Sequence, residues 1–353
     1  MNATVSALCT PTPTAATRSA QPLPTPAQLR ARLPLSLGAA ASVQRGREAV
    51  RAIMRGDDPR LLVIAGPCSL HDSDAALDYA QRLAELAPQV SDQVLLVMRA
   101  YVEKPRTTIG WKGLVYDPQL DGSSDMAGGL AMARRLLLDI AELGLPLATE
   151  LLQPLAAGYL DDLLSWAAIG ARTSESQIHR EMVSGLDLPV GFKNGTDGSV
   201  AIACDAMRSA AHPHQHFGMD EQGRAAMVQT RGNPDTHLVL RGGHSGPNYQ
   251  PEAVAAACAA LEAQSIRPNL IVDCSHANSG KDPARQPQVL ESVIAQRLAG
   301  QTHLRGVMLE SHLFDGCQPL RAPLQYGVSV TDACLGWEGT SQALLRAADA
   351  LRS

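Results

Sequence analysis

The stretch that decides the fold is QVLLVMRAYVEKPRTTIGWKG, residues 93–113. Its apolar run Val94–Met98 has the length and β-branched content of a strand that is buried on both faces. The run ends on the charged residue Arg99, and a loop containing Lys104–Thr108 follows. Two cations, two hydroxyls and a φ-restricting proline suit a cluster of phosphate or carboxylate oxygens. A solvated basic turn is the better explanation of such a loop when it occurs alone.

The same alternation of apolar runs and polar ends occurs along the chain. Runs of strand length are separated mostly by segments with helical periodicity, and they lie at residues 61–67, 94–100, 145–151, 166–172, 188–194, 236–242, 270–274 and 305–309. Strands that alternate with helices pair in parallel, and eight such units close a barrel. No G-x-G-x-x-G motif opens a helix after these strands, which weighs against a dinucleotide-binding sheet. The sequence therefore predicts an α/β fold, a (β/α)8 TIM barrel over residues 61–353.

Three segments depart from this repeat. Residues 1–28 are rich in Pro, Ala and Thr, so we expect a disordered or loosely docked tail, in preference to an organellar transit peptide. Residues 29–60 form an N-terminal extension with an accessory helix over 42–55. Between the fifth and sixth strands, glycines on both sides of 225–229 predict an inserted β-hairpin at about 212–234.

Composition argues against several classes of function. The hydrophobic content of 45% and the charged content of 18% are typical of a soluble globular protein. A net charge of −5 and an aromatic content of 3% provide neither a basic field nor a stacking surface for nucleic acid. No apolar run approaches the roughly 20 residues of a membrane span. Seven scattered cysteines without a CxxC motif indicate reduced thiols, so we expect a cytoplasmic protein.

The ends of the predicted strands carry a second pattern. In an α/β barrel these ends converge on one face. In chain order they hold Cys68, Arg99, Glu150, Arg172, Lys193, Arg241, His276 and Glu310. A surface ion pair or a buried small thiol explains any one of these residues, but not eight of them on one rim.

These residues fall into two chemical groups. Six cations would need bound anions to offset their mutual repulsion, and their guanidinium and ammonium groups match phosphate and carboxylate oxygens: Arg99, Lys104, Arg106, Arg172, Lys193 and Arg241. The second group consists of Cys68, His276 and Glu310, joined by Asp332 in the segment VTDACLGW. A thiolate, an imidazole and two carboxylates suit a first-row divalent ion without selecting one metal.

Several segments resemble those of 3-deoxy-D-arabino-heptulosonate 7-phosphate (DAHP) synthases of type I, the feedback-regulated bacterial and yeast enzymes. These segments, which extend from about residue 60 to the C-terminus, are AGPCSLHD (65–72), MRAYVEKPRTTIGWKGLVYDP (98–118), AIGARTSESQ (168–177), PVGFKNGTDGS (189–199), LRGGHSGPNY (240–249), DCSHANSGK (273–281), GVMLESHL (306–313) and TDACLGWE (331–338). The resemblance implies an α/β barrel that condenses phosphoenolpyruvate with erythrose 4-phosphate and water, the first step of the shikimate pathway to the aromatic amino acids.

The resemblance also implies roles for individual residues. One divalent ion of the manganese, iron, cobalt or zinc class would be bound by Cys68, His276, Glu310 and Asp332. Phosphoenolpyruvate would be bound by Arg99, Lys104, Arg172, Lys193 and Arg241. Erythrose 4-phosphate would be bound by Lys104, Pro105, Arg106 and Thr107. The residues expected to take part in catalysis are Lys104, His276 and Cys68.

Regulation and assembly are further expectations. Family members bind an aromatic amino acid outside the barrel mouth, and the corresponding candidates here are Gln153, Asp187, His216 and Gly218. Gly218 favours tyrosine, whereas Gln153 and Asp187 depart from the family pattern and leave another effector, or none, open. We expect a homo-oligomer, either a dimer or a tetramer. Cys334 and Cys68 are either a neighbouring oxidisable pair or two unconnected buried thiols.

Three other functions remain open from the sequence. The chain could be an aldolase that forms a Schiff base on Lys193, a synthase for a different phosphosugar, or a non-catalytic sensor of aromatic amino acids. The KPRTTIGWKG loop favours the four-carbon aldose. The complete cation and metal-ligand sets argue against a sensor, because a protein without catalysis has no use for a mutually repelling cluster.

Overall fold

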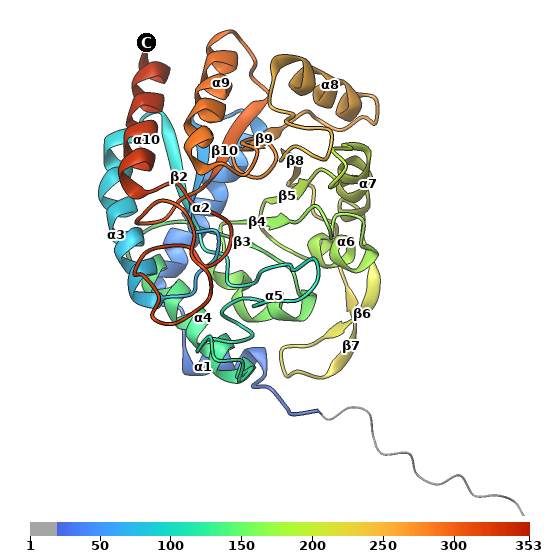
Figure 1. Cartoon of the computed structure of the whole chain (residues 1–353). Helices are drawn as coiled ribbons and strands as arrows, with labels where there is room; N and C mark the ends of the chain where they lie inside the picture. Colours follow the sequence, from blue (N-terminus) through green and yellow to red (C-terminus); the bar gives the residue numbers. More distant parts are fainter. Residues whose placement is uncertain (1–19) are drawn as a thin grey trace, which may run out of the picture.

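A computed structural model describes residues 20–353 and contains a closed barrel of parallel strands (Figure 1). The strand order around the barrel is β1-β10-β9-β8-β5-β4-β3-β2. These strands are β1 (Leu61–Gly66), β2 (Val94–Arg99), β3 (Leu147–Glu150), β4 (Trp166–Ile169), β5 (Val190–Lys193), β8 (Thr236–Leu240), β9 (Leu270–Asp273) and β10 (Leu304–Glu310). The predicted (β/α)8 barrel is confirmed.

Helices surround the barrel (Figure 1). They are α3 (Ser73–Val90), α4 (Met126–Glu142), α5 (Pro154–Leu160), α6 (Gln177–Ser184), α7 (Ala201–Ala210), α8 (Pro251–Glu262), α9 (Gln286–Leu298) and α10 (Trp337–Arg352), with 3-10 turns η1 (Asp161–Leu163) and η2 (Pro283–Arg285). Helix α3 shows how the sequence starts such a helix, because the Asp72 carboxylate accepts hydrogen bonds from the N–H groups of Asp74 and Ala75. In the described part of the chain, no helix combines the length and apolar character needed to cross a bilayer.

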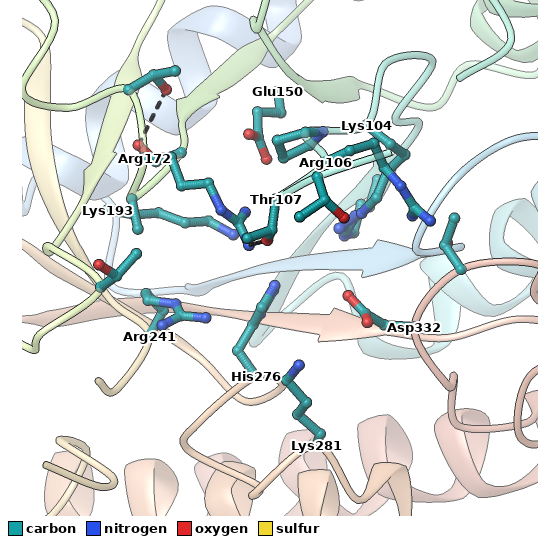
Figure 2. A pocket seen from close by; sticks show the side chains of 18 of the residues that line it. Lys104, Arg106, Thr107, Glu150, Arg172, Lys193, Arg241, His276, Lys281 and Asp332 are labelled. Carbon is teal, nitrogen blue, oxygen red and sulfur yellow. Dashed lines mark hydrogen bonds between the residues drawn. The ribbon is translucent and has the colours of Figure 1, made fainter. Parts of the chain in front are cut away.

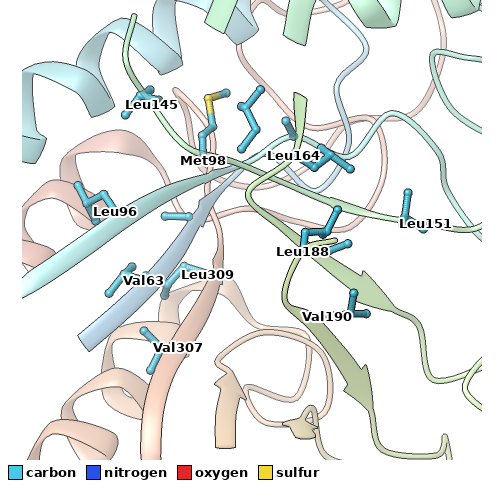
Figure 3. Close-up of a cluster of buried hydrophobic side chains, with 14 of the residues drawn as sticks. Val63, Leu96, Met98, Leu145, Leu151, Leu164, Leu188, Val190, Val307 and Leu309 are labelled. Atoms are coloured by element: carbon cyan, nitrogen blue, oxygen red, sulfur yellow. The ribbon is translucent and has the colours of Figure 1, made fainter. Parts of the chain in front are cut away.

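The strands are buried on both faces, as their apolar runs predicted. In β1, Leu61 and Val63 belong to the cluster between strands and helices, whereas Leu62 and Ile64 pack inside the barrel. Figure 3 shows part of the outer cluster, which includes Val63. The barrel is therefore a packed core, and its functional site has to lie at one end.

Helix α2 (Leu37–Arg55) closes the amino-terminal end of the barrel. Its residues Val50, Ile53 and Met54 join the interior cluster. The helix begins at Leu37 rather than at 42, because the Ser36 hydroxyl accepts a hydrogen bond from the Ala39 N–H and caps it. The carboxyl ends of the strands are thus the end that remains for ligands.

The N-terminal segment is ordered earlier than the sequence analysis expected. Helix α1 (Pro26–Arg32) begins inside the predicted tail, because Thr25 and Gln28 form a capping box and Pro26 opens the first turn. Leu29 is fully buried and anchors the helix. The prediction for residues 1–19 of the tail lies outside the described residues.

The predicted hairpin is confirmed within residues 212–234. It consists of β6 (Gln215–Met219) and β7 (Ala225–Gln229), which pair antiparallel and follow β5 in the chain before β8. The Asp220 carboxylate organises the connecting turn by accepting hydrogen bonds from the Gln222 and Arg224 N–H groups. The hairpin projects from the side of the barrel beyond α6 (Figure 1).

Candidate active site

A cavity of about 300 Å³ lies at the carboxyl ends of the strands (Figure 2). The side chains around it come from segments far apart in the sequence, and they include Arg99, Lys104, Arg106, Thr107, Glu150, Arg172, Lys193, Arg241, His276 and Asp332. Six of the eight predicted strand-end residues line this cavity, whereas Cys68 and Glu310 do not and instead contact Lys104 and Arg99. Arg172 lies in a turn three residues beyond β4, rather than at the end of the strand itself.

The buried cations of the cavity are held in place by protein groups. Arg99 pairs with Glu310 at 2.8 Å and stacks over the Tyr101 ring. Lys193 pairs with Asp273 at 3.0 Å. Burial alone would raise the pKa of Asp273, but the charges of Lys193 and its other neighbours hold it well below the usual range.

The outer cations are free for ligands. Within residues 20–353, no carboxylate lies within ion-pairing distance of Arg106, Arg172 or Arg241. Arg172 donates only to the Thr107 hydroxyl, at 3.2 Å, which joins the loop after β2 to the turn after β4. A guanidinium without a carboxylate partner at the mouth of a cavity is a ready receptor for phosphate or carboxylate oxygens.

A set of possible metal donors lies beside these cations. Donor atoms of Cys68, Glu310 and Asp332 all lie within 4.8 Å of one another. Burial would raise the pKa of Glu310, but the nearby charges of His276, Arg99 and Lys104 lower it to about 2, so this carboxylate is ionised at neutral pH. One thiol and two carboxylates fit a first-row divalent ion of intermediate softness.

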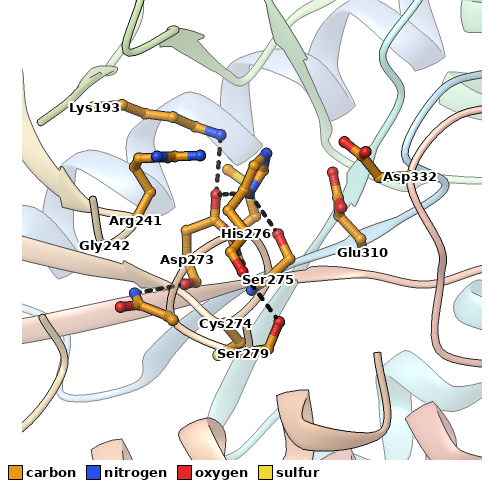
Figure 4. A network of polar contacts seen from close by, with 12 residues as sticks. Lys193, Arg241, Gly242, Asp273, Cys274, Ser275, His276, Ser279, Glu310 and Asp332 are labelled. Carbon is orange, nitrogen blue, oxygen red and sulfur yellow. Dashed lines mark hydrogen bonds and ion pairs between the residues drawn. The ribbon is translucent and has the colours of Figure 1, made fainter. Parts of the chain in front are cut away.

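His276 stands next to this set rather than within it (Figure 4). Its Nδ1 lies 2.7 Å from the Ser275 hydroxyl and 3.0 Å from an Asp273 carboxylate oxygen. Its backbone is in the left-handed region, with a φ of 55°, an unusual conformation for a residue other than glycine. A histidine whose Nδ1 is held by a carboxylate is oriented to offer Nε2 as a ligand.

Lys104, which lines the cavity, is in direct contact with the buried Cys68. The Lys104 ammonium lies 3.1 Å from the Cys68 sulfur and donates to the Cys68 carbonyl at 3.2 Å. Burial and the Glu310 charge raise the pKa of the Cys68 thiol. The Cys334 sulfur accepts a hydrogen bond from the Cys68 N–H at 3.4 Å, so the two cysteines are neighbours, while their redox coupling stays a prediction.

Sequence reasoning left some functional residues without a role. Asp273 orients both Lys193 and His276, and its signal was a carboxylate directly after the apolar run Leu270–Val272. Lys281 also lines the cavity, at the end of the DCSHANSGK segment. Asp273 and Lys281 are the two ends of the segment DCSHANSGK (273–281), and their charge is the signal that the sequence offers for them.

Glu103 connects the loop that lines the cavity to the segment after β3, and the sequence analysis predicted no role for it. Its carboxylate accepts hydrogen bonds from the N–H groups of Leu152 and Gln153, each at 3.4 Å, and from the Tyr116 hydroxyl at 3.3 Å. Burial raises its pKa to about 7, despite these hydrogen bonds. Because Glu103 directly precedes Lys104, it ties the position of the loop Lys104–Thr108 to the segment after β3.

A second cavity, of about 580 Å³, lies between the hairpin, α1, α5 and α6. Three of the four predicted effector residues line it, namely Gln153, His216 and Gly218. Asp187 does not. Its side chain is 81% exposed and pairs with Arg51 at 2.6 Å at the amino-terminal end of the barrel, so its assignment to this pocket was wrong.

Comparisons with known proteins agree with this geometry. The sequence profile of the DAHP synthetase I family matches residues 34–345. The Tyr-sensitive phospho-2-dehydro-3-deoxyheptonate aldolase of Escherichia coli strain K12 is 56% identical over 322 residues, which are 90% of each chain. The tyrosine-inhibited enzyme of Schizosaccharomyces pombe is 48% identical over 327 residues, 91% of this chain and 88% of the relative.

Other relatives extend the comparison to a second effector and to a solved structure. The Phe-sensitive aldolase of E. coli K12 is 48% identical over 324 residues, 91% of this chain and 92% of the relative. The solved structure of phospho-2-dehydro-3-deoxyheptonate aldolase from Francisella tularensis SCHU S4 is 42% identical, with a TM-score of 0.93, and covers 96% of this chain and 99% of that one. The family profile, the relatives and the strand-end constellation agree, and the chain belongs to the DAHP synthetase I family.

Proposed function

We propose that this chain condenses phosphoenolpyruvate with erythrose 4-phosphate and water to give DAHP and phosphate. The observation that carries this proposal is a cavity lined by unpaired cations that shares Asp332 with a thiol and carboxylate donor set. Each substrate carries a phosphate group, and phosphoenolpyruvate also carries a carboxylate. The arginine and lysine side chains of the cavity can bind and neutralise these phosphate and carboxylate groups.

Phosphoenolpyruvate is assigned to the cations on the β4, β5 and β8 side of the cavity. Arg172 and Arg241 have no carboxylate partner among the described residues and bind its phosphate and carboxylate oxygens directly. Lys193 and Arg99 are buried and held by Asp273 and Glu310, so their positions are fixed before the substrate arrives. Such preorganisation lowers the entropic cost of reaching the reactive geometry.

Erythrose 4-phosphate is assigned to the loop Lys104–Thr107. The hydrogen bond between Arg172 and Thr107 places this loop against the phosphoenolpyruvate side of the cavity. The two substrates therefore lie next to each other, with the aldehyde facing carbon 3 of phosphoenolpyruvate.

The family is metal-dependent, and a divalent ion bound by Cys68, Glu310, Asp332 and His276 would polarise the aldehyde oxygen as a Lewis acid. Carbon 3 of phosphoenolpyruvate then attacks the aldehyde carbon, and water adds to carbon 2. Phosphate leaves with cleavage of the carbon–oxygen bond. Lys104 is the cation placed to give a proton to the new alkoxide, because it lines the cavity and its ammonium lies 3.1 Å from the sulfur of Cys68, a proposed metal donor.

The contacts of Lys193 favour this reaction over a Schiff-base aldolase. A Schiff base needs a free amine, whereas the Lys193 ammonium lies 3.0 Å from the buried Asp273 carboxylate. Borohydride reduction in the presence of the substrates should therefore leave the mass of the protein unchanged. A covalent adduct on Lys193 would favour the aldolase.

The pocket beside the hairpin is proposed to bind an aromatic amino acid. It combines apolar side chains with the charged residues Arg30, Asp161 and Glu221, which suits a zwitterion with a ring. The names of the E. coli and S. pombe relatives favour tyrosine, as does Gly218. Inhibition assays with tyrosine, phenylalanine and tryptophan test this choice, and a variant with a bulky side chain at Gly218 should lose inhibition but keep basal activity.

A homo-oligomer is proposed from an exposed apolar pair on the hairpin. Phe217 is fully exposed, and Met227, its cross-strand partner, is 66% exposed. An isolated two-stranded sheet with an uncovered apolar pair is marginally stable by itself, so a second copy of the chain is proposed to cover it. Sedimentation of the wild type and a Phe217→Lys variant would measure this association, and a monomeric wild type would contradict it.

The catalytic proposal is tested with the purified protein. Consumption of phosphoenolpyruvate should require erythrose 4-phosphate, stop after treatment with a chelator, and return when manganese or another first-row divalent ion is added. A condensation rate that is unaffected by complete metal removal would contradict the metal assignment. Failure to use the four-carbon aldose, with turnover of a longer phosphosugar, would contradict the substrate assignment.

A further inference from the structure

A smaller cavity, of about 220 Å³, lies beside the metal donor set. We call it the side cavity, and we call the cavity of about 300 Å³ at the strand ends the substrate cavity. The two cavities share the lining residues His276, Lys281, Thr331 and Asp332. Glu310 lines only this side cavity. Two of the three donor residues, Glu310 and Asp332, thus line the side cavity, whereas only Asp332 lines the cavity that the proposed reaction uses.

The two cavities differ sharply in charge. The lining of the substrate cavity contains the two carboxylates of Glu150 and Asp332 and seven cations, which are Arg99, Lys104, Arg106, Arg172, Lys193, Arg241 and Lys281. Among its charged residues, the side cavity has the carboxylates of Glu310 and Asp332 and the single cation Lys281. Hydroxyl groups and a thiol complete its polar lining, from Ser275, Ser279, Thr331 and Cys317. A divalent cation is repelled by the first lining and attracted by the second.

Bound substrates increase this difference, because two phosphorylated molecules occupy the substrate cavity during turnover. We propose that the side cavity is the route by which the divalent ion reaches and leaves the donor set formed by Cys68, Glu310 and Asp332. This inference rests on the proposed function, since it takes these residues as ligands of the ion.

Cys317 lies in the wall of the side cavity and gives experimental access to it. Paired hydrogen bonds between the backbones of Gly316 and Cys334, at 2.8 and 3.0 Å, fix the position of the neighbouring Cys317. Its side chain is exposed, whereas the other described cysteines are buried. A thiol reagent will therefore react first at Cys317 in a Cys9→Ser background, which removes the cysteine outside the described residues.

The experiment compares an adduct in each opening. The first protein is the Cys9→Ser variant labelled at Cys317 with a neutral, bulky maleimide. The matched control carries Cys9→Ser, Cys317→Ser and Ile109→Cys, labelled with the same reagent. Ile109 is 93% exposed and lines the substrate cavity but not the side cavity. Cobalt(II) is the probe, and its uptake and its loss to a chelator are followed by absorbance in the absence of substrates.

We expect the adduct at Cys317 to slow uptake and loss of cobalt by a similar factor, about tenfold, and to leave the Kd unchanged. An obstructed route changes both rates together, whereas a lost ligand would change the Kd. The adduct at position 109 should leave both rates as in the unlabelled protein. In a second arm, small charged adducts at Cys317 should differ, with a cationic reagent slowing uptake more than an anionic one.

Other results would overturn the proposal. If labelling at Cys317 leaves both rates unchanged, or if only the adduct at position 109 slows them, the ion uses the substrate cavity. If the unlabelled protein does not bind one cobalt ion per chain, the metal assignment itself fails together with this route. Stoichiometric binding with unchanged rates therefore refutes only the route.

Discussion

The two ends of the barrel use their arginines in opposite ways. At the amino-terminal end, Arg51 of α2 pairs with both Asp187 and Asp235 at 2.6 Å, so its charge is satisfied within the protein. At the carboxyl end, Arg172 and Arg241 have no carboxylate partner among the described residues. This difference shows that a charge is structural where the chain supplies its counter-ion, and is available for a ligand where the chain supplies none.

Removing an arginine at the carboxyl end should produce the largest effect. We expect Arg241→Ala to lower kcat/KM for phosphoenolpyruvate by about 10²- to 10³-fold, because a charge-assisted contact to the substrate is lost. The melting temperature should change little or rise, since removing Arg241 relieves repulsion within the cation cluster. Steady-state kinetics and thermal unfolding of the same sample check both expectations. An unfolded variant, or one with wild-type kinetics, would contradict them.

Glu103 is an acid buried near the carboxyl end of the barrel, so the pH dependence of stability provides a second test of the comparison. Its pKa is raised to about 7 by burial, so between pH 4.5 and 7 the unfolded chain ionises this group before the folded protein does. The folded protein gains stability from protonated Glu103 in full below the unfolded pKa, and this contribution is lost as pH rises through about 7. The loss amounts to about 3 kcal/mol in the free energy of unfolding.

A Glu103→Gln variant should lose this pH dependence while keeping an acceptor for the Leu152 and Gln153 N–H groups. Chemical denaturation at several pH values measures the slope, with Glu48→Gln on the exposed side of α2 as control. An unchanged slope in Glu103→Gln would assign the titration to other groups.

The packing of α2 against the barrel predicts the next effect. A Cβ at Gly46 would lie 2.5 Å from the Ser165 hydroxyl oxygen and 2.9 Å from Pro146 Cβ. Gly46→Ala should therefore displace α2 and destabilise the fold by about 1–3 kcal/mol. Gly38→Ala in the same helix is the matched control, because its nearest contact would be 3.8 Å away and alanine favours helix by about 0.5–1 kcal/mol. Equal free energies of unfolding for Gly46→Ala and Gly38→Ala would contradict the close packing of α2 against the amino-terminal end of the barrel.

Removing an arginine at the amino-terminal end should produce the smallest effect and complete the comparison. Arg51→Ala should lower the free energy of unfolding by about 1 kcal/mol, because its two ion pairs are partly exposed. Unlike Arg241→Ala, it should leave kcat/KM within about twofold of the wild type. A large loss of activity without loss of stability would show that the two ends are not functionally separate.

Particular residues show which features of the fold and the site could be predicted from the sequence. The strand ends could be read from local patterns, because a buried parallel strand needs a continuous apolar run and a charged residue marks where burial ends. The start of α1 is also encoded locally, in the capping box of Thr25 and Gln28 and in Pro26, although the composition of residues 1–28 is typical of a tail. Asp187 was misplaced because its partner, Arg51, is 136 residues away in the chain.

By itself, the sequence determined the eight strands, the inserted hairpin and the inventory of cations and metal donors. Each of these depends on residue type and on spacing over a few turns or strands. Only the tertiary structure decided that Glu103 supports the segment after β3, that Asp273 orients both Lys193 and His276, and that Glu310 and Asp332 line the side cavity. The physical reason is that burial, ion pairing and charge repulsion depend on distances between segments, which exist only once the barrel has closed.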